Sequence, residues 1–212
     1  KPSDRWQPEQ EVAIRRLLNQ FGDSDSLGYV ATRRDKLLHF GPEQRAAISY
    51  QVFGGVCLAS GDPVGDPAAW DETIMSWEAH ARSYGWTPAV LACSEDGARG
   101  YRRTIGLDAI RLGDEAILHP ESFRLDSTSL TEVRRARRRL RRDGAVVEIN
   151  WQGDLSAESL GAVGTLAELW RTGDEERGFS MEVGRLDDPP DSRQVEVLAK
   201  DSGGLPHAHQ TF

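Results

Sequence analysis

Seven of the nine residues between Val133 and Asp143 are arginines, and none is a lysine. The chain has 26 Lys and Arg against 34 Asp and Glu; without the seven arginines, 19 basic residues remain against the same 34 acidic ones. Guanidinium groups suit bidentate contact with phosphate, and like charges four residues apart on a helix repel unless a partner neutralises them. The run therefore predicts an anionic partner: nucleic acid, phospholipid headgroups or the protein's own carboxylates.

The pattern around these arginines predicts a helix. Ser129 and Glu132 have the spacing of a capping box, and Gly144 is placed to end the helix in a left-handed conformation. Apolar residues recur at helical spacing, at Leu130, Val133, Ala136 and Leu140. We expect this stripe to pack on a sheet while the guanidinium groups spread over the other faces. The alternative is a solvated amphipathic face without a partner.

The rest of the chain alternates helical and strand patterns. Helices are expected at 8–21, 66–85, 95–104 and 157–171, the second opened by an Asp66-Pro67 cap and ended by Gly85. Strands are expected at 29–32, 36–40, 46–53, 56–60, 87–93, 107–112, 115–119, 145–151, 194–199 and 207–212, the last two as a hairpin. Several strands follow one another without a helix, so we expect an α/β fold with a mixed, largely antiparallel sheet flanked by helices.

The composition and the spacing of residues indicate neither a membrane-spanning helix nor a metal site. Hydrophobic residues make up 38% and charged residues 28%, which is ordinary for a soluble globular protein. The longest apolar stretch, 52–59, is too short to span a bilayer. Cys57 and Cys93 lie in strand-like runs without metal-ligand spacing, so we expect two buried thiols. His207 and His209 alternate along a strand but are too few for a metal site.

The segment from Gly54 to Pro67, GGVCLASGDPVGDP, resembles the signature of the C-terminal domain of phosphatidylglycerol lysyltransferases, the lysyl- and alanyl-phosphatidylglycerol synthases. Other segments resemble the same family in the same order: DSLGY at 25–29, RDK at 34–36, SE at 94–95, LGDEA at 112–116, ERGFSM at 176–181 and GRL at 184–186. The match extends from about Gln10 to Phe212, and the arginine helix occupies the place of the family's basic helix.

The resemblance implies a tandem of two acetyltransferase-like (GNAT) units, the first at 1–125 and the second, truncated, at 126–212. It implies transfer of an aminoacyl group, lysine by default, from aminoacyl-tRNA to phosphatidylglycerol at the cytoplasmic face of the membrane, by a chain that is itself soluble. An N-terminal membrane domain or a fused tRNA synthetase is expected outside this segment. No cofactor is expected, since RRDGAV at 141–146 lacks the final small residue of an acetyl-CoA loop and follows a helix.

The family motifs also indicate binding residues, although no catalytic residue is assigned. For the aminoacyl group or the lipid they indicate Asp62, Glu95, Glu115, Phe179 and Ser180. For phosphate of tRNA or lipid they indicate Arg134, Arg135, Arg138, Arg139 and Arg142, with Arg134 and Arg139 ranked first. Structural alternatives stay open: Asp62 closes a turn, Glu95 sits in the first turn of a helix, Glu115 pairs with an arginine, and Phe179 packs into the core.

Two rival functions fit the same sequence. The first is a GNAT-like transferase with another acceptor, such as a peptidoglycan precursor or a small amine. The second is a non-catalytic module that uses the arginine helix to hold RNA or an anionic membrane.

Overall fold

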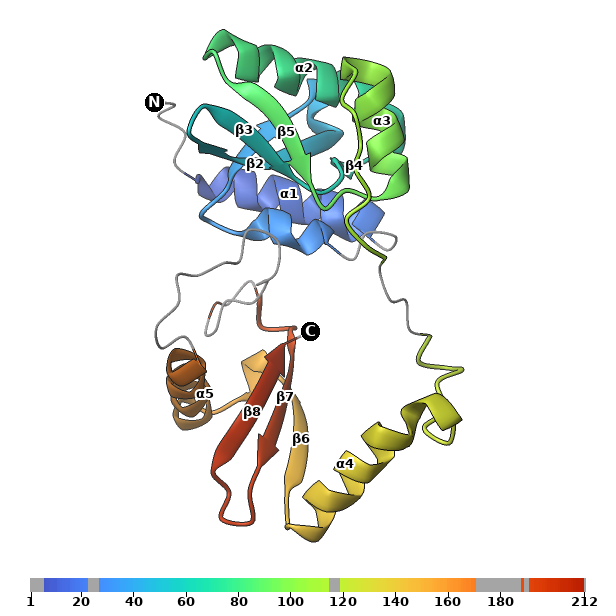
Figure 1. Ribbon diagram of the computed structural model, residues 1–212. Helices are drawn as coiled ribbons and strands as arrows, with labels where there is room; N and C mark the ends of the chain where they lie inside the picture. The colour runs from blue at the N-terminus through green and yellow to red at the C-terminus, as the bar shows by residue number, and fades with distance from the viewer. Residues whose placement is uncertain (1–5, 23–26, 115–118, 171–187, 189–190, 212) are drawn as a thin grey trace. The chain divides into compact units, whose positions relative to one another are not determined.

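The computed structural model describes residues 6–22, 27–114, 119–170, 188 and 191–211. They fall into two compact units, the first reaching Gly113 and the second beginning at Asp114. Figure 1 shows both units and labels most of their helices and strands. No helix among the described residues is both long enough and apolar enough to cross a membrane.

The first unit is built on a mixed sheet. Its strands are β1 (Leu37–Phe40), β2 (Ala46–Phe53), β3 (Val56–Ser60), β4 (Val64–Gly65) and β5 (Thr87–Leu91). The order is β1-β2-β3-β5, with β4 paired to β2. All pairs are antiparallel except β3 and β5, which run parallel, so their carboxyl ends meet at one edge of the sheet.

Helices cover both faces of this sheet. Helix α1 (Pro8–Phe21) buries Ile14 and Leu17 with Ala47 of β2. On the other face, α2 (Trp70–Ser83) and α3 (Glu95–Ile105) form the larger core, whose members are Ile48, Tyr50, Cys57, Ala59, Ile74, Trp77, Ala81 and Tyr101. Because side chains alternate along a strand, β2 supplies neighbouring residues to both cores. Three short 3₁₀ helices complete the unit, at Gly28–Thr32 (η2), Pro42–Gln44 (η3) and Pro67–Ala69 (η4).

The second unit contains the arginine helix and a three-stranded antiparallel sheet. Its helices are α4 (Thr131–Arg142) and α5 (Ala157–Trp170), with 3₁₀ turns η5 (Thr128–Leu130) and η6 (Gln152–Asp154). Its strands are β6 (Val146–Trp151), β7 (Val195–Lys200) and β8 (Pro206–Thr211), in the order β6-β7-β8. Helix α5 packs against β8 (Figure 1).

The two faces of this second sheet have unusual chemistry. On β7, Glu196 and Leu198 are buried, and their partners on β8, Thr211 and His209, are partly buried. The opposite face exposes apolar side chains on β6, with Val147 at 58%, Ile149 at 69% and Trp151 at 49% exposure. Polar groups thus lie on the buried face while apolar ones face outward.

The predicted fold class is confirmed, as are most of the predicted elements. Helices α1, α3 and α5 and strands β2, β3 and β6 lie where the sequence predicts them, and β7 and β8 form the predicted hairpin. Asp66 accepts a hydrogen bond from the Ala68 amide, although the first turn is 3₁₀ and α2 begins at Trp70. Gly85 follows α2 with φ +71°, as a helix-ending glycine should.

Two predicted strands are wrong. Residues 29–32 belong to η2, where the Thr32 hydroxyl donates to the Tyr29 carbonyl at 2.8 Å and so closes a helical turn. Residues 107–112 form no strand and pair with no strand in the described part of the chain, and Ile110 and Leu112 are exposed. Of the strand predicted at 115–119, residues 115–118 lie outside the described residues.

Candidate functional site

The arginines of α4 form two rows along the helix. Successive residues are about 100° apart around a helix axis, so positions three, four and seven residues apart share a face. The first row, here called the pocket row, contains Arg134, Arg137, Arg138 and Arg141. The second, the paired row, contains Arg135, Arg139 and Arg142. The third face carries Val133, Ala136 and Leu140.

The pocket row lines a pocket of about 250 Å³ together with Leu125 and Asp126. Arg134 anchors the chain that leads into the helix, because its Nη1 donates to the carbonyls of Leu125, at 2.6 Å, and Ser127. The other three arginines make no hydrogen bond or ion pair with any described residue. Three of the four guanidinium groups that border this pocket therefore have no described partner, and a single carboxylate lies beside them, an arrangement suited to a phosphate group.

The paired row is partly neutralised by local carboxylates. Arg135 Nη1 lies 2.6 Å from Glu132 Oε1, and Asp143 lies 3.8 Å from Arg139 Nε and 3.5 Å from Arg142 Nε. All of these side chains are solvent-exposed, so each pair contributes little to stability. The pairs nevertheless reduce the positive charge that this face offers to a ligand.

Two predictions about α4 are wrong. Glu132 pairs with Arg135, and the Ser129 hydroxyl bonds the Ser127 hydroxyl at 2.7 Å, so no capping box forms; Leu130 takes the N-cap position without a side-chain bond. The apolar stripe is not packed away, since Val133 and Leu140 are 49% and 52% exposed. Gly144 does take the predicted left-handed conformation, with φ +80°.

The predicted phosphate ligands fall on both rows. Arg134 and Arg138 belong to the pocket row, and Arg135, Arg139 and Arg142 to the paired row. Arg137 and Arg141, which the sequence analysis left out, also line the pocket. Their spacing of three and seven residues from Arg134 is the signal that could have found them. The phosphate role of every arginine stays a prediction.

Asp62 joins a sheet edge to a helix. It follows β3 and accepts two hydrogen bonds from Ser94, from the amide at 2.9 Å and from the hydroxyl at 2.6 Å. Ser94 in turn caps α3 by accepting from the Gly97 amide at 3.0 Å. A Cβ at Gly97 would lie 1.8 Å from Asp62 Oδ1, so only glycine permits this approach. The Asp62 carboxylate therefore occupies the start of α3, where an anionic ligand would otherwise be favoured.

The carboxylate of Asp62 also influences two neighbouring groups. Burial raises the pKa of the Cys93 thiol, and the negative charge of Asp62 raises it further. Burial likewise raises the pKa of Tyr101 well above its ordinary value, again with Asp62 contributing. Cys57 is buried and Cys93 half-buried, and neither forms a disulfide. Burial raises the pKa of the Cys57 thiol to about 12, so this group stays protonated at neutral pH.

The other predicted substrate-binding residues are less constrained. Glu95 lies in the first turn of α3, next to Ser94, where its exposed side chain pairs with Arg99. The structure thus brings Asp62 and Glu95 to the same helix start. Glu115, Phe179 and Ser180 lie outside the described residues. Substrate binding by any of these five residues stays a prediction.

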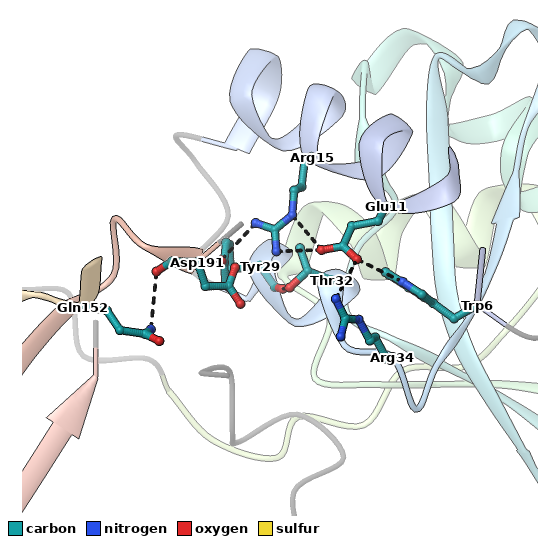
Figure 2. A network of polar contacts seen from close by, with 8 residues as sticks. All are labelled: Trp6, Glu11, Arg15, Tyr29, Thr32, Arg34, Gln152 and Asp191. Atoms are coloured by element: carbon teal, nitrogen blue, oxygen red, sulfur yellow. Dashed lines mark hydrogen bonds and ion pairs between the residues drawn. The ribbon is translucent and has the colours of Figure 1, made fainter. Parts of the chain in front are cut away.

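A buried carboxylate on α1 was missed by the sequence analysis. Glu11 is 8% exposed and accepts hydrogen bonds from Trp6 Nε1 at 3.2 Å, Arg15 Nε at 3.1 Å and Arg34 Nη2 at 3.4 Å (Figure 2). Arg15 also donates to the Tyr29 hydroxyl at 3.1 Å, which fastens α1 to η2. In the second unit, Gln152 Nε2 donates to the Asp191 carbonyl at 3.4 Å.

No group of three or more His, Cys, Asp or Glu side chains in the described ranges is arranged to hold a metal ion. The two histidines of β8 have carboxylate partners instead. His207 Nε2 lies 2.9 Å from Asp201 Oδ2, and His209 Nε2 contacts Glu196 Oε2.

Comparison with curated proteins gives close relatives in several actinobacteria. The lysylphosphatidylglycerol biosynthesis bifunctional protein LysX of Mycobacterium sp. (strain JLS) is 52% identical over 198 residues, which is 92% of this chain and 18% of that protein. The LysX proteins of Mycolicibacterium vanbaalenii and Rhodococcus jostii are 54% and 49% identical, covering 90% of this chain and 17% of their own length. The chain thus spans less than a fifth of these relatives.

Solved structures share the fold. L-PGS from Bacillus licheniformis matches all of this chain with a TM-score of 0.82 at 19% identity, and the match covers 62% of that chain. The C-terminal domain of a putative lysylphosphatidylglycerol synthetase from Agrobacterium fabrum matches 96% of this chain with a TM-score of 0.81 at 21% identity, covering 63% of that domain. The family model described as "Phosphatidylglycerol lysyltransferase, C-terminal" matches residues 15–210. The chain therefore belongs to the family of phosphatidylglycerol lysyltransferase C-terminal domains.

Proposed function

We propose that this chain is part of an enzyme that transfers an aminoacyl group, lysine by default, from aminoacyl-tRNA to phosphatidylglycerol. The reaction takes place at the cytoplasmic face of the membrane, and the remaining parts of the longer protein are a membrane domain or a tRNA synthetase. The two units correspond to a first GNAT-like unit followed by a second. The names of the relatives refer to the biosynthesis of lysylphosphatidylglycerol, which supports phosphatidylglycerol as the acceptor.

The observation that carries this proposal is the pocket row of α4. Arg137, Arg138 and Arg141 border a pocket without neutralising partners in the described part of the chain. Both substrates carry phosphodiesters, and each arginine near an anionic membrane surface contributes about 1 kcal/mol of attraction. The row is thus placed to hold either a tRNA backbone or a lipid headgroup.

The proposed reaction needs no covalent intermediate on the protein. An aminoacyl ester is already activated, so catalysis requires orientation, stabilisation of the tetrahedral oxyanion and a base for the lipid hydroxyl. The ammonium groups of a lysyl substrate call for carboxylates. Of the two predicted carboxylates at the start of α3, Glu95 is the better candidate, because both oxygens of Asp62 already accept hydrogen bonds from Ser94.

The direct test uses the full-length protein that contains this chain. It is incubated with phosphatidylglycerol vesicles and either lysyl-tRNA or alanyl-tRNA carrying a radiolabelled amino acid, and labelled lipid is extracted. We expect labelled phosphatidylglycerol with one of the two tRNAs and none when phosphatidylcholine replaces the acceptor. Absence of labelled lipid with both tRNAs would contradict the proposal.

A second candidate function is a non-catalytic module that binds RNA or anionic membrane. The observation in its favour is that no residue of α4 is buried, and every arginine of the helix except the half-buried Arg134 is exposed. If this is the function, the chain will bind phosphatidylglycerol vesicles with a strong dependence on salt, while the full-length protein makes no aminoacylated lipid.

A further inference from the structure

Glu196 is a fully buried carboxylate in the second unit. It lies on β7, directly across the ladder from Thr211 of β8, and its residue is 0% exposed. Its Oε2 accepts a hydrogen bond from the Thr211 hydroxyl at 3.0 Å and another from Nε2 of His209. The next buried pair of this ladder, Leu198 with His209, brings the imidazole to the same face.

The second oxygen of this carboxylate has no partner. Glu196 Oε1 is buried, and no described residue donates a hydrogen bond to it. Such an atom is costly to bury, and native proteins retain few of them without a purpose. Lys200, further along β7, does not serve it, because its Nζ is paired with Glu148 at 2.7 Å. An unpaired, buried carboxylate oxygen is a feature that stability alone does not explain.

The hydrogen bond from His209 determines which ring nitrogen remains available. In the tautomer in which Nε2 of His209 donates to the Glu196 carboxylate, Nδ1 is the nitrogen that can accept a proton. Nδ1 makes no hydrogen bond with any described residue, and the side chain is 15% exposed. A carboxylate that holds an imidazole by one nitrogen, leaving the other to face a reactant, is the usual arrangement of a general base.

We propose that Glu196 and His209 form an acid–base pair, in which His209 Nδ1 accepts the proton of a hydroxyl-bearing acceptor. Glu196 is the positioning residue, and Thr211 fixes the carboxylate. The inference rests on the proposed function, whose acceptor is the glycerol hydroxyl of phosphatidylglycerol. As that proton passes to Nδ1, the hydroxyl oxygen bonds to the carbonyl carbon of the aminoacyl ester. The ester bond to the ribose then breaks, and the ribose oxygen takes the proton back from Nδ1.

The test of this pair measures aminoacyl transfer by the full-length protein and by its His209→Gln variant. We expect the turnover number to fall by roughly 10²–10⁴-fold, the usual contribution of a general base, with KM for the lipid changed less than about threefold. The matched control is His207→Gln on the same strand, whose imidazole is exposed and bonded to Asp201; its activity should stay at the wild-type level. Glu196→Gln should lower turnover while leaving lipid binding intact.

Two further readings separate chemistry from folding. The melting temperatures of the variants must match that of the wild type, and added imidazole should restore part of the activity of His209→Ala by filling the space of the lost ring. A folded His209→Gln variant that keeps activity within about threefold of an active wild type overturns the inference alone, as does a loss that imidazole does not rescue. An inactive wild type, with every tRNA offered, overturns the proposed function and the inference with it.

Discussion

The sheets of the two units are covered in different ways. In the first unit, α1 packs on one face and α2 with α3 on the other, and Ala46 to Tyr50 of β2 are buried without a break. In the second unit, α5 lies against β8, and the apolar residues of β6 stay exposed in the part of the chain that the structure describes. The first unit thus buries both faces of its sheet, whereas the second leaves apolar and cationic side chains exposed among the described residues.

The two units should differ most in the stability that each loses when a tryptophan is replaced. Trp77 of α2 is 0% exposed and meets Tyr101 edge to face with ring centroids 6.2 Å apart, while Trp151 of β6 is 49% exposed. Trp77→Ala should lower the free energy of unfolding of the first unit by about 3–5 kcal/mol, because it leaves a cavity in the core. Trp151→Ala should change stability by less than about 1 kcal/mol. Urea-induced unfolding measures both, and equal losses would remove the distinction between the units.

One helical glycine in each unit shows how closely its helix is packed. A Cβ at Gly97 of α3 would collide with Asp62 Oδ1, whereas one at Gly161 of α5 would meet nothing within 4 Å. Gly97→Ala should therefore destabilise the protein by about 1–3 kcal/mol, since Asp62 must leave its position on Ser94. Gly161→Ala should stabilise it by about 0.5–1 kcal/mol through helix propensity. Thermal unfolding tests both signs, and a stabilising Gly97→Ala would refute the role given to Asp62.

Lowering the pH should destabilise the first unit through protonation of His39. Burial lowers the pKa of His39 to about 4, with the charge of His80 contributing, and its Nε2 lies 2.8 Å from the Ser76 hydroxyl. The unfolded chain, with an ordinary histidine pKa of about 6.5, binds this proton more readily. The stability from neutral His39 is therefore complete above pH 6.5 and is lost as the pH falls toward 4.

The expected loss is about 1–2 kcal/mol, because His39 is only partly shielded from solvent. Urea unfolding of the wild type and of His39→Gln at a series of pH values would measure it. The variant should show a flatter dependence between pH 6.5 and 4. Identical pH profiles would exclude His39 as the source.

The sequence predicts elements well where local chemistry is decisive. Asp66-Pro67 and Gly85 mark the limits of the α2 region, and alternating apolar residues locate β2 and β3, because caps and period-two patterns act over a few residues. The strand predicted at 29–32 failed for a local reason too, since Thr32 bonds the Tyr29 carbonyl and closes a helical turn. A short apolar run does not by itself distinguish a strand from a turn of 3₁₀ helix.

The candidate site depends more on distant contacts. The arginine run and its two rows follow from helical spacing, but which row borders a pocket and which is paired depends on Leu125, Asp126 and Asp143 lying against particular faces of α4. The contact between Glu196 and His209 depends on the register of β7 and β8, which includes an irregularity at Ala199 and Lys200. Register is fixed by packing and turn geometry, so the side chains that meet across a ladder cannot be read from residue types alone.

Vesicle binding measures whether the pocket row of α4 is the anion-binding surface of this chain. Two triple variants remove the same charge: Arg137→Gln, Arg138→Gln and Arg141→Gln in the pocket row, or Arg135→Gln, Arg139→Gln and Arg142→Gln in the paired row. Affinity for phosphatidylglycerol vesicles should fall by about 10²-fold for the first and only a few-fold for the second, whose arginines already have carboxylate partners. Equal losses in the two variants would show that net charge alone attracts the membrane and would contradict the claim.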